Sequence, residues 1–330
     1  MRPLPADASP VDRLIASHRL RAMELLPWLG AIATYFLFPG YLPLASQVLI
    51  MILFALSLDL VLGYAGIVTL GQSAFFGAGA YAAGIYSVHV SGEPISGLMV
   101  AAAAGATVGF ASGLVILRTT GLTLLMLTLA VTSLLEEAAN HASFLTGGAD
   151  GLQGMTINPI LGTFGFDMFG RTAYVYSLIV LFIGWLVVRT LVHAPFGHSL
   201  VGIRENDARM HAIGTPVRQR LLTAYTISAA LSGVAGGLLA QTTQFVGLTV
   251  LGFERSGAIV IMLVLGGAGR LYGAFIGAAL YMVAQDQIAE ADPVFWDFWI
   301  GLLLVLIVLF ARGGVLGLYD RLVLAAGRHR

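Results

Sequence analysis

The apolar stretch ASQVLIMILFALSLDLVLG occupies residues 45–63 and holds a single charged side chain, Asp59. About 20 apolar residues in a helix cross the roughly 30 Å of hydrocarbon in a bilayer, so this run predicts a transmembrane helix. A carboxylate inside such a helix is costly and often functional. Asp59 therefore has two interpretations: an interfacial carboxylate capped by nearby hydroxyls or water, or a polar anchor beside a path through the protein.

The rest of the chain repeats this pattern. Of its 330 residues, 58% are apolar and only 10% are charged, whereas a soluble domain carries about 25% charged residues. The mean hydropathy is +0.89. We therefore predict an all-α, polytopic integral membrane protein with about ten transmembrane helices, some of them short or broken. The predicted spans are 26–43, 45–63, 70–90, 97–117, 121–140, 173–192, 220–243, 256–268, 271–289 and 294–311.

The eighth predicted span is short and ends at LGGAGRLYG, residues 265–273. Such a sequence indicates a broken or re-entrant helix. Irregular backbone is tolerated at membrane depth only where protein or a water-filled cavity surrounds it. This part of the chain is therefore expected to lie against other helices.

Arginine residues predict the orientation. With the N-terminus inside, all but two of the 17 basic residues fall on the cytoplasmic side, the exceptions being Arg171 and Arg255. This distribution agrees with the positive-inside rule. It predicts cytoplasmic termini, with an N-terminal tail at 1–25, a membrane domain at 26–312 and a C-terminal tail at 313–330.

Missing residue types exclude several kinds of chemistry. The chain has no cysteine, which excludes disulfides and thiolate ligands. It also has no lysine, and a nucleotide-binding P-loop requires one. No His-Glu-x-x-His motif or His/carboxylate cluster has metal-ligand spacing. We therefore predict no enzymatic site, no metal, no bound cofactor and no nucleic-acid partner. If nucleotide energy drives this protein, another subunit must bind the nucleotide.

The charge of the chain gathers in one predicted cytoplasmic link, about 193–219, around GHSLVGIRENDARMHAIG at 197–214. Pro195 ends the preceding helix and Gly214 is expected to end the next. Between them we predict about four turns of amphipathic helix. Its apolar stripe carries Leu200, Ile203 and Met210, and its opposite face carries the i,i+4 pair Glu205 and Arg209.

Two interpretations of this helix remain open from the residues alone. It could be a linker that lies on lipid headgroups by its apolar stripe. It could instead be a coupling helix that docks a cytoplasmic motor.

The link resembles the cytoplasmic loop of branched-chain amino acid ABC transporter permeases of the LivM type, which typically read G-R-x-L-x-A-I-R-E-N-E-x-A-A-x-A-x-G. The matching positions are Gly197, Leu200, Ile203, Arg204, Glu205, Asn206, Ala212 and Gly214. Asp207 replaces the usual second Glu and keeps its charge. His198 and Gly202 depart from the common Arg and Ala.

Four further stretches are similar to motifs of the same family. They are DLVLGYAGIVTLGQSAFFGAGAYAAG (59–84), FLTGGADGL (144–152), ISAALSGVAGGLLA (227–240) and VLGGAGRLYGAFIGAALY (264–281). Thr69 stands where the family usually has Ser, Arg270 takes a small polar position and Ala274 takes a Pro. Five motifs in order make the match specific, and it covers about residues 45–318.

The resemblance implies a permease subunit of an ATP-driven ABC importer in a bacterial inner membrane, working by alternating access. Its implied partners are a homologous LivH-type permease, two cytoplasmic ATPases that bind ATP and Mg, an external substrate-binding protein and membrane lipid. The implied cargo is a branched-chain or other hydrophobic amino acid. The nearest alternative cargo is urea or a short amide.

The resemblance also assigns roles within the charged link. It implies that Leu200, Ile203 and Met210 form an apolar contact with the ATPase. Arg204, Glu205, Asp207 and Arg209 would set the register of docking by charge complementarity.

Other residues are candidates for a path or for helix packing. A possible path or entry would use Asp59, Glu136, Gln241 and Thr242. Close helix packing is expected at Gly66, Gly71, Gly79, Gly267, Gly269, Gly273 and Gly277. Two alternative classes stay open: a secondary transporter that uses Asp59 and Glu136 for proton coupling, and a membrane scaffold that transports nothing.

Overall fold

The computed structural model describes residues 26–160, 162, 164–167, 170–296, 298–302, 305, 314 and 317. Within these residues the chain is helical, and β-structure is limited to two isolated bridges. The α-helices are α2 (Leu26–Leu37), α3 (Leu42–Leu58), α4 (Gln72–His89), α5 (Pro94–Ile116), α6 (Leu122–His141), α7 (Ser143–Thr146), α8 (Arg171–His193), α9 (Pro195–Glu205), α10 (Asp207–Ala212), α11 (Val217–Thr243), α12 (Phe253–Gly266) and α13 (Leu271–Ala291). Short helical turns cover Pro39–Tyr41, Gly148–Asp150 and Leu248–Val250, and a π-helix covers Asp59–Tyr64.

Five helical segments of the described chain are long and apolar enough to cross a membrane, and the bent pair α12–α13 adds a sixth if it is counted as one span. The five are Pro39–Tyr64, Pro94–Ile116, Leu122–His141, Arg171–His193 and Val217–Thr243. This confirms a polytopic helical membrane protein. It gives fewer clear spans than the ten predicted.

Sequence features explain the difference in span number. The first predicted span ends early, because α2 has only 12 residues and Pro39 begins a separate short turn. The third corresponds to α4, which is rich in Gly, Ala and polar residues. Half of the tenth predicted span, the predicted tail at 1–25 and nearly all of the predicted tail at 313–330 lie outside the described residues.

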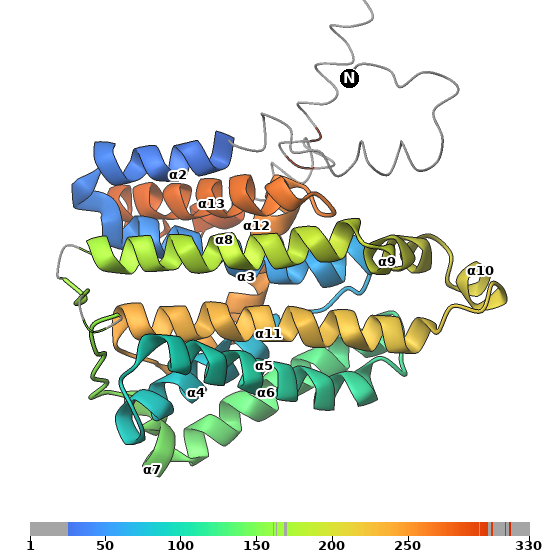
Figure 1. The fold of residues 1–330 in the computed structure, drawn as a ribbon, viewed down its shortest axis with the longest axis horizontal. Helices are drawn as coiled ribbons and strands as arrows, with labels where there is room; N and C mark the ends of the chain where they lie inside the picture. Colours follow the sequence, from blue (N-terminus) through green and yellow to red (C-terminus); the bar gives the residue numbers. More distant parts are fainter. Residues whose placement is uncertain are drawn as a thin grey trace, which may run out of the picture.

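Helix α11 is the central helix of the bundle. It packs most extensively against α5 and α4 and also against α3. Figure 1 shows α4, α5 and α6 on one side of it and α8, α2 and α13 on the other. About 61% of the apolar window of α11 is buried, compared with 22% of that of α6. The outer helices therefore present apolar faces that suit a lipid surrounding.

Small residues let the helix backbones approach closely. A Cβ added at Gly79 of α4 would collide with the backbone of Gly233 in α11, and a Cβ at Gly236 would collide with the carbonyl of Phe76. Packing of this kind brings helices together in membranes without a hydrophobic driving force.

A buried polar network joins the same helices. The Nε2 of Gln72 donates to the hydroxyls of Ser57 at 3.1 Å and Ser228 at 2.8 Å. The amide of Ser73 donates to the hydroxyl of Ser256 at 2.9 Å. These bonds link α4 with α3, α11 and α12, and they satisfy polar groups that cannot reach water.

The pair α12–α13 is bent by 116° at residues 267–270, which confirms the prediction that the eighth span is short and broken. Gly267 and Gly269 have φ angles of 108° and 78° in this loop, a region that glycine enters without steric cost. Beyond the loop, a Cβ at Gly273 would meet the carbonyl of Gly267, and one at Gly277 would meet the carbonyl of Met262. Glycines thus permit both the turn and the close return of α13.

We predict that Gly79→Ala lowers the free energy of unfolding by about 1–3 kcal/mol, because its new methyl group would push α4 away from α11. The control is Gly257→Ala on α12, where no atom lies within 4 Å of the added Cβ. Detergent unfolding followed by tryptophan fluorescence measures both changes. Equal stability of the two variants would contradict the close packing of α4 on α11.

Candidate functional site

The charged link forms two helices instead of the single four-turn helix predicted. Helix α9 begins at Pro195 and ends at Glu205, and α10 runs from Asp207 to Ala212. Between them Asn206 has extended backbone angles, φ −159° and ψ 96°, and its side-chain oxygen accepts the backbone N–H of Arg209 at 2.9 Å. Asparagine favours this N-cap role. The side chain of Asn206 therefore starts a second helix where the periodicity predicted continuation.

This break separates the predicted pair of Glu205 and Arg209, which now lie on different helices. Both side chains are exposed, as are Asn206 and Asp207. His211 instead pairs with Asp207 at 3.6 Å within α10. The exposed surface of α9–α10 is therefore polar and carries both signs of charge.

The predicted apolar stripe faces the protein itself. Leu200 and Ile203 are 0% and 6% exposed, and Leu200 belongs to an apolar cluster that includes Leu60 and Val61. Met210 is half-buried, and its sulfur lies beside Gly202, so it packs α10 back on α9. The burial of Leu200 and Ile203 corrects the expectation that they form an apolar contact for a partner, whereas a contact of Met210 with a partner stays a prediction. The three side chains hold the segment on its own helices.

The remaining matched glycines and alanine of the link lie at its bends or its surface. Gly197 lies so close to the carbonyl of Val192 that a Cβ would collide with it. Ala212 and Gly214 are exposed, and Gly214 has a φ angle of 83° just after α10. A glycine in this conformation commonly ends a helix.

Asp59 lies at the start of the π-helix that continues α3. Its side chain is fully buried, and its Oδ1 accepts the backbone N–H of Gly269 at 2.6 Å. A Cβ at Gly63 would collide with the same oxygen, so a glycine makes room for this contact. The carboxylate is thus capped by a backbone amide from the loop between α12 and α13. The sequence had suggested hydroxyls or water.

Arg204 reaches into the same region from α9. Its Nη1 donates a hydrogen bond to the carbonyl of Gly63. Gly66, with a φ angle of 75°, packs against the side chain of Arg204, and a Cβ at Gly269 would lie 3.3 Å from Nη1. Arg204 is exposed as well as bonded to the chain's own backbone, so its predicted role in docking a partner stays a prediction. The link, the π-helix and the α12–α13 loop therefore meet at one point, which we call the Asp59 junction.

The other predicted path residues do not join this junction. Gln241 is buried, accepts from the hydroxyl of Tyr176 at 2.9 Å and donates to the carbonyl of Pro94 at 2.8 Å, so it ties α11 to α8 and α5. Thr242 donates to the carbonyl of Leu238 in its own helix at 2.8 Å. Glu136 is half-buried on α6. Their role in a path stays a prediction.

The predicted packing glycine Gly71 faces Thr128, where a Cβ would lie 3.0 Å from both the Cβ and the carbonyl oxygen. Among the described residues, no group of three His, Asp or Glu side chains is placed to hold a metal ion. That the chain binds no metal or cofactor stays a prediction.

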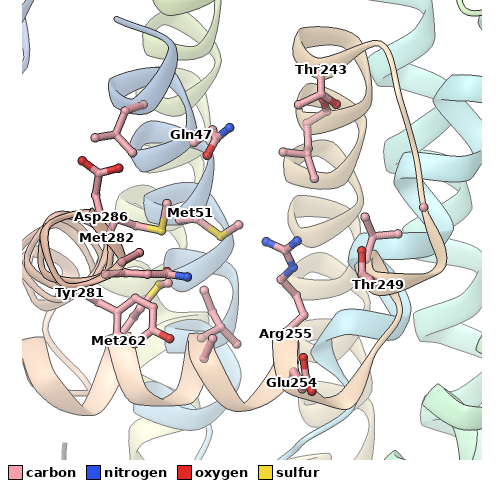
Figure 2. Close-up of a pocket in the computed structure, with 18 of the residues that line it drawn as sticks. Gln47, Met51, Thr243, Thr249, Glu254, Arg255, Met262, Tyr281, Met282 and Asp286 are labelled. Carbon is pink, nitrogen blue, oxygen red and sulfur yellow. The ribbon is translucent and has the colours of Figure 1, made fainter. Parts of the chain in front are cut away.

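Sequence reasoning missed a cavity of about 790 Å³ between α3, α11, α12 and α13 (Figure 2). Arg255 at the start of α12 and Asp286 on α13 both line it. The rule that charged residues within membrane helices are often functional would have selected these two residues as it selected Asp59.

The spanning helices and the bent helix pair define a multi-pass membrane protein, in which a charged segment is hydrogen-bonded to the π-helix of one span. The family described as the permease component of branched-chain amino acid transport systems matches residues 40–308. The chain belongs to this family. It is therefore a transport permease component, which implies a transport subunit and not an enzyme.

The chain is similar to permease proteins from several organisms. The high-affinity branched-chain amino acid transport system permease protein LivM of Escherichia coli K12 is 28% identical over 304 residues, covering 84% of this chain and 70% of its own. The autoinducer 2 import system permease protein LsrC of Klebsiella pneumoniae is 32% identical over 155 residues, 44% of this chain and 41% of its own. A probable LivM of Methanocaldococcus jannaschii is 24% identical over 160 residues, 43% of this chain and 46% of its own. No solved structure matches the chain significantly.

We predict that Asp59→Ala lowers the free energy of unfolding by about 1–3 kcal/mol, because the half-buried N–H of Gly269 would lose its acceptor. Asp59→Asn retains an oxygen at that position and should keep most of the stability. Hydrogen exchange of the peptide covering 264–273 should accelerate in the alanine variant only. Asp150→Ala, at an exposed acid, is the control. Equal losses in the asparagine and alanine variants would show that the acceptor is not what matters.

Proposed function

We propose that this chain is the transmembrane permease subunit of an ATP-driven ABC importer in a bacterial inner membrane. The proposed cargo is a branched-chain or other hydrophobic amino acid. Support comes from the family match and from the relatives named LivM, one of which covers 84% of the chain. The match to LsrC is shorter, so autoinducer-like cargo has weaker support. Urea or a short amide remains an alternative cargo.

The proposed assembly needs other chains to supply energy and cargo. Two cytoplasmic ATPases would bind ATP and Mg, since this chain has no lysine for a P-loop. A homologous LivH-type permease would complete the membrane part. A substrate-binding protein would deliver the cargo from outside. These partners are typical of ABC importers, and the family match is the reason to expect them here.

The Asp59 junction is the observation that carries the proposed coupling. The exposed, charged surface of α9–α10 would dock on an ATPase, while the buried stripe of α9 keeps the segment fixed to the spans. Arg204 then bonds this segment to Gly63, and Asp59 bonds the same turn to Gly269. Through these two bonds, movement of α9 would displace the loop at which α12 and α13 fold back. Such a displacement would support alternating access.

A proton-coupled secondary transporter is the second candidate, in which the buried Asp59 and the half-buried Glu136 would carry the proton. Asp59 already accepts a backbone N–H within the fold. Uptake that survives ATP depletion and stops when the proton gradient collapses would favour this alternative over an ABC importer.

We predict that mild-detergent purification of the tagged chain from native membranes recovers a homologous permease and ATPases with Walker motifs. Arg209→Glu reverses a charge on the exposed surface and should reduce ATPase recovery about tenfold or more. Arg118→Glu makes the same change at an exposed arginine in another predicted cytoplasmic link, and it should leave recovery unchanged. Purification of a homo-oligomer free of ATPase would contradict the ABC assignment.

We predict that Arg204→Ala uncouples hydrolysis from uptake. The other exposed charges of the docking surface, Glu205, Asp207 and Arg209, would remain, so ATPases should still co-purify and hydrolyse ATP within about twofold of the normal rate. Cargo uptake should fall about tenfold, because a charge-assisted hydrogen bond contributes about 1.5–3 kcal/mol. Arg204→Lys retains one donor and should recover part of the uptake. Joint measurement in proteoliposomes tests this, and parallel losses of hydrolysis and uptake would contradict it.

A further inference from the structure

The cavity between α3, α11, α12 and α13 combines an apolar lining with a few polar groups. Its apolar wall includes Met51, Ile259, Met262 and Met282. Figure 2 shows Arg255 extending from the start of α12 toward the space, with the methionines beside it and Asp286 across from it on α13. A volume of about 790 Å³ falls within the range of small-molecule sites, roughly 300–1,000 Å³.

The guanidinium of Arg255 forms no hydrogen bond and no ion pair with any residue that the structure describes. Its guanidinium lies 5.7 Å from the ring centroid of Phe76, so one side of it is occupied by an aromatic face. Cations at membrane depth almost always pair with an anion or a carbonyl. A guanidinium in this position is suited to a carboxylate, which it binds in a bidentate manner.

Asp286 supplies the opposite charge in the same cavity without forming an ion pair to Arg255. A second carboxylate, Glu254, also lines the cavity, but it is exposed and lies next to Arg255 on α12, below it in Figure 2. The cavity therefore offers a cationic group and an anionic group from separate helices, with flexible thioether side chains between them. Methionine adapts to apolar groups of different shapes.

We propose that this cavity binds an apolar α-amino acid as a zwitterion. The carboxylate pairs with Arg255, the ammonium group faces Asp286, and the side chain packs on Met51, Met262 and Met282. This inference rests on the proposed function, and it names the residues that would recognise the cargo within this subunit. It also places the site at the end of α12 that is remote from the Asp59 junction.

The chain contains no cysteine, so a single introduced thiol is the only site in it that a maleimide labels. Met282→Cys introduces one thiol in the cavity wall, and Gln287→Cys introduces one at an exposed position of the same helix outside the cavity. The rate of labelling by N-ethylmaleimide is measured on the whole complex in native membranes. Leucine at millimolar concentration should slow labelling at position 282 and leave position 287 unchanged.

Two analogues and two variants test the chemistry. Leucinamide lacks the carboxylate and 4-methylpentanoate lacks the ammonium group, so each should protect position 282 about tenfold less well than leucine. Arg255→Gln should raise the leucine concentration for half-protection by about tenfold or more, and Arg255→Lys should recover part of it. An unchanged labelling rate at position 287 checks that the Arg255→Gln complex still folds.

Several results would overturn the inference: no protection by leucine, equal protection by leucinamide, or unchanged protection in Arg255→Gln. ATP-driven leucine uptake is measured separately on the unlabelled Gln287→Cys complex, whose substitution lies outside the cavity. Uptake without protection would reject this site and leave the proposed function in place. Protection without ATP-driven uptake would keep the binding site and reject the importer.

Discussion

The hydrogen bond from the backbone of Gly269 to the buried carboxylate of Asp59 is the constraint on which the arrangement depends. It joins the end of the most buried spanning segment, Pro39–Tyr64, to the loop where α12 and α13 fold back. A buried carboxylate that lost this donor would be strongly destabilised. A Cβ at position 63 would occupy the space of the carboxylate oxygen, so this position requires glycine.

Much of the fold follows from the sequence. The apolar runs at 70–90 and 173–192 correspond to α4 at Gln72–His89 and α8 at Arg171–His193, because long helices are fixed by local composition and end at Gly, Pro or polar clusters. The break before α13 was predicted from its glycines. The early end of α2 was not, although Pro39 lies within the predicted span, since proline is tolerated in many membrane helices.

The candidate site was predicted less well, and the reasons are physical. Helical periodicity correctly put Leu200 and Ile203 on one face but could not show whether that face meets a partner or the chain itself. Asn206 is compatible with both a helix interior and a cap, and only its bond to the Arg209 amide decides between them. The contacts of Arg204 with Gly63 and of Asp59 with Gly269 join residues 141 and 210 positions apart, which no local pattern encodes.

The π-helix at Asp59–Tyr64 accommodates an extra residue in the helix that continues α3. A π-turn winds in one residue more than an α-turn. If these six residues rewound as α-helix, the released residue would shift everything before it by about 1.5 Å along the axis and turn it by about 100°. The side chain of Asp59 would then leave the amide of Gly269 while the carbonyl of Gly63 kept its place near Arg204. Conversion between the π-helical and α-helical forms would therefore move α3 by one residue relative to the α12–α13 loop.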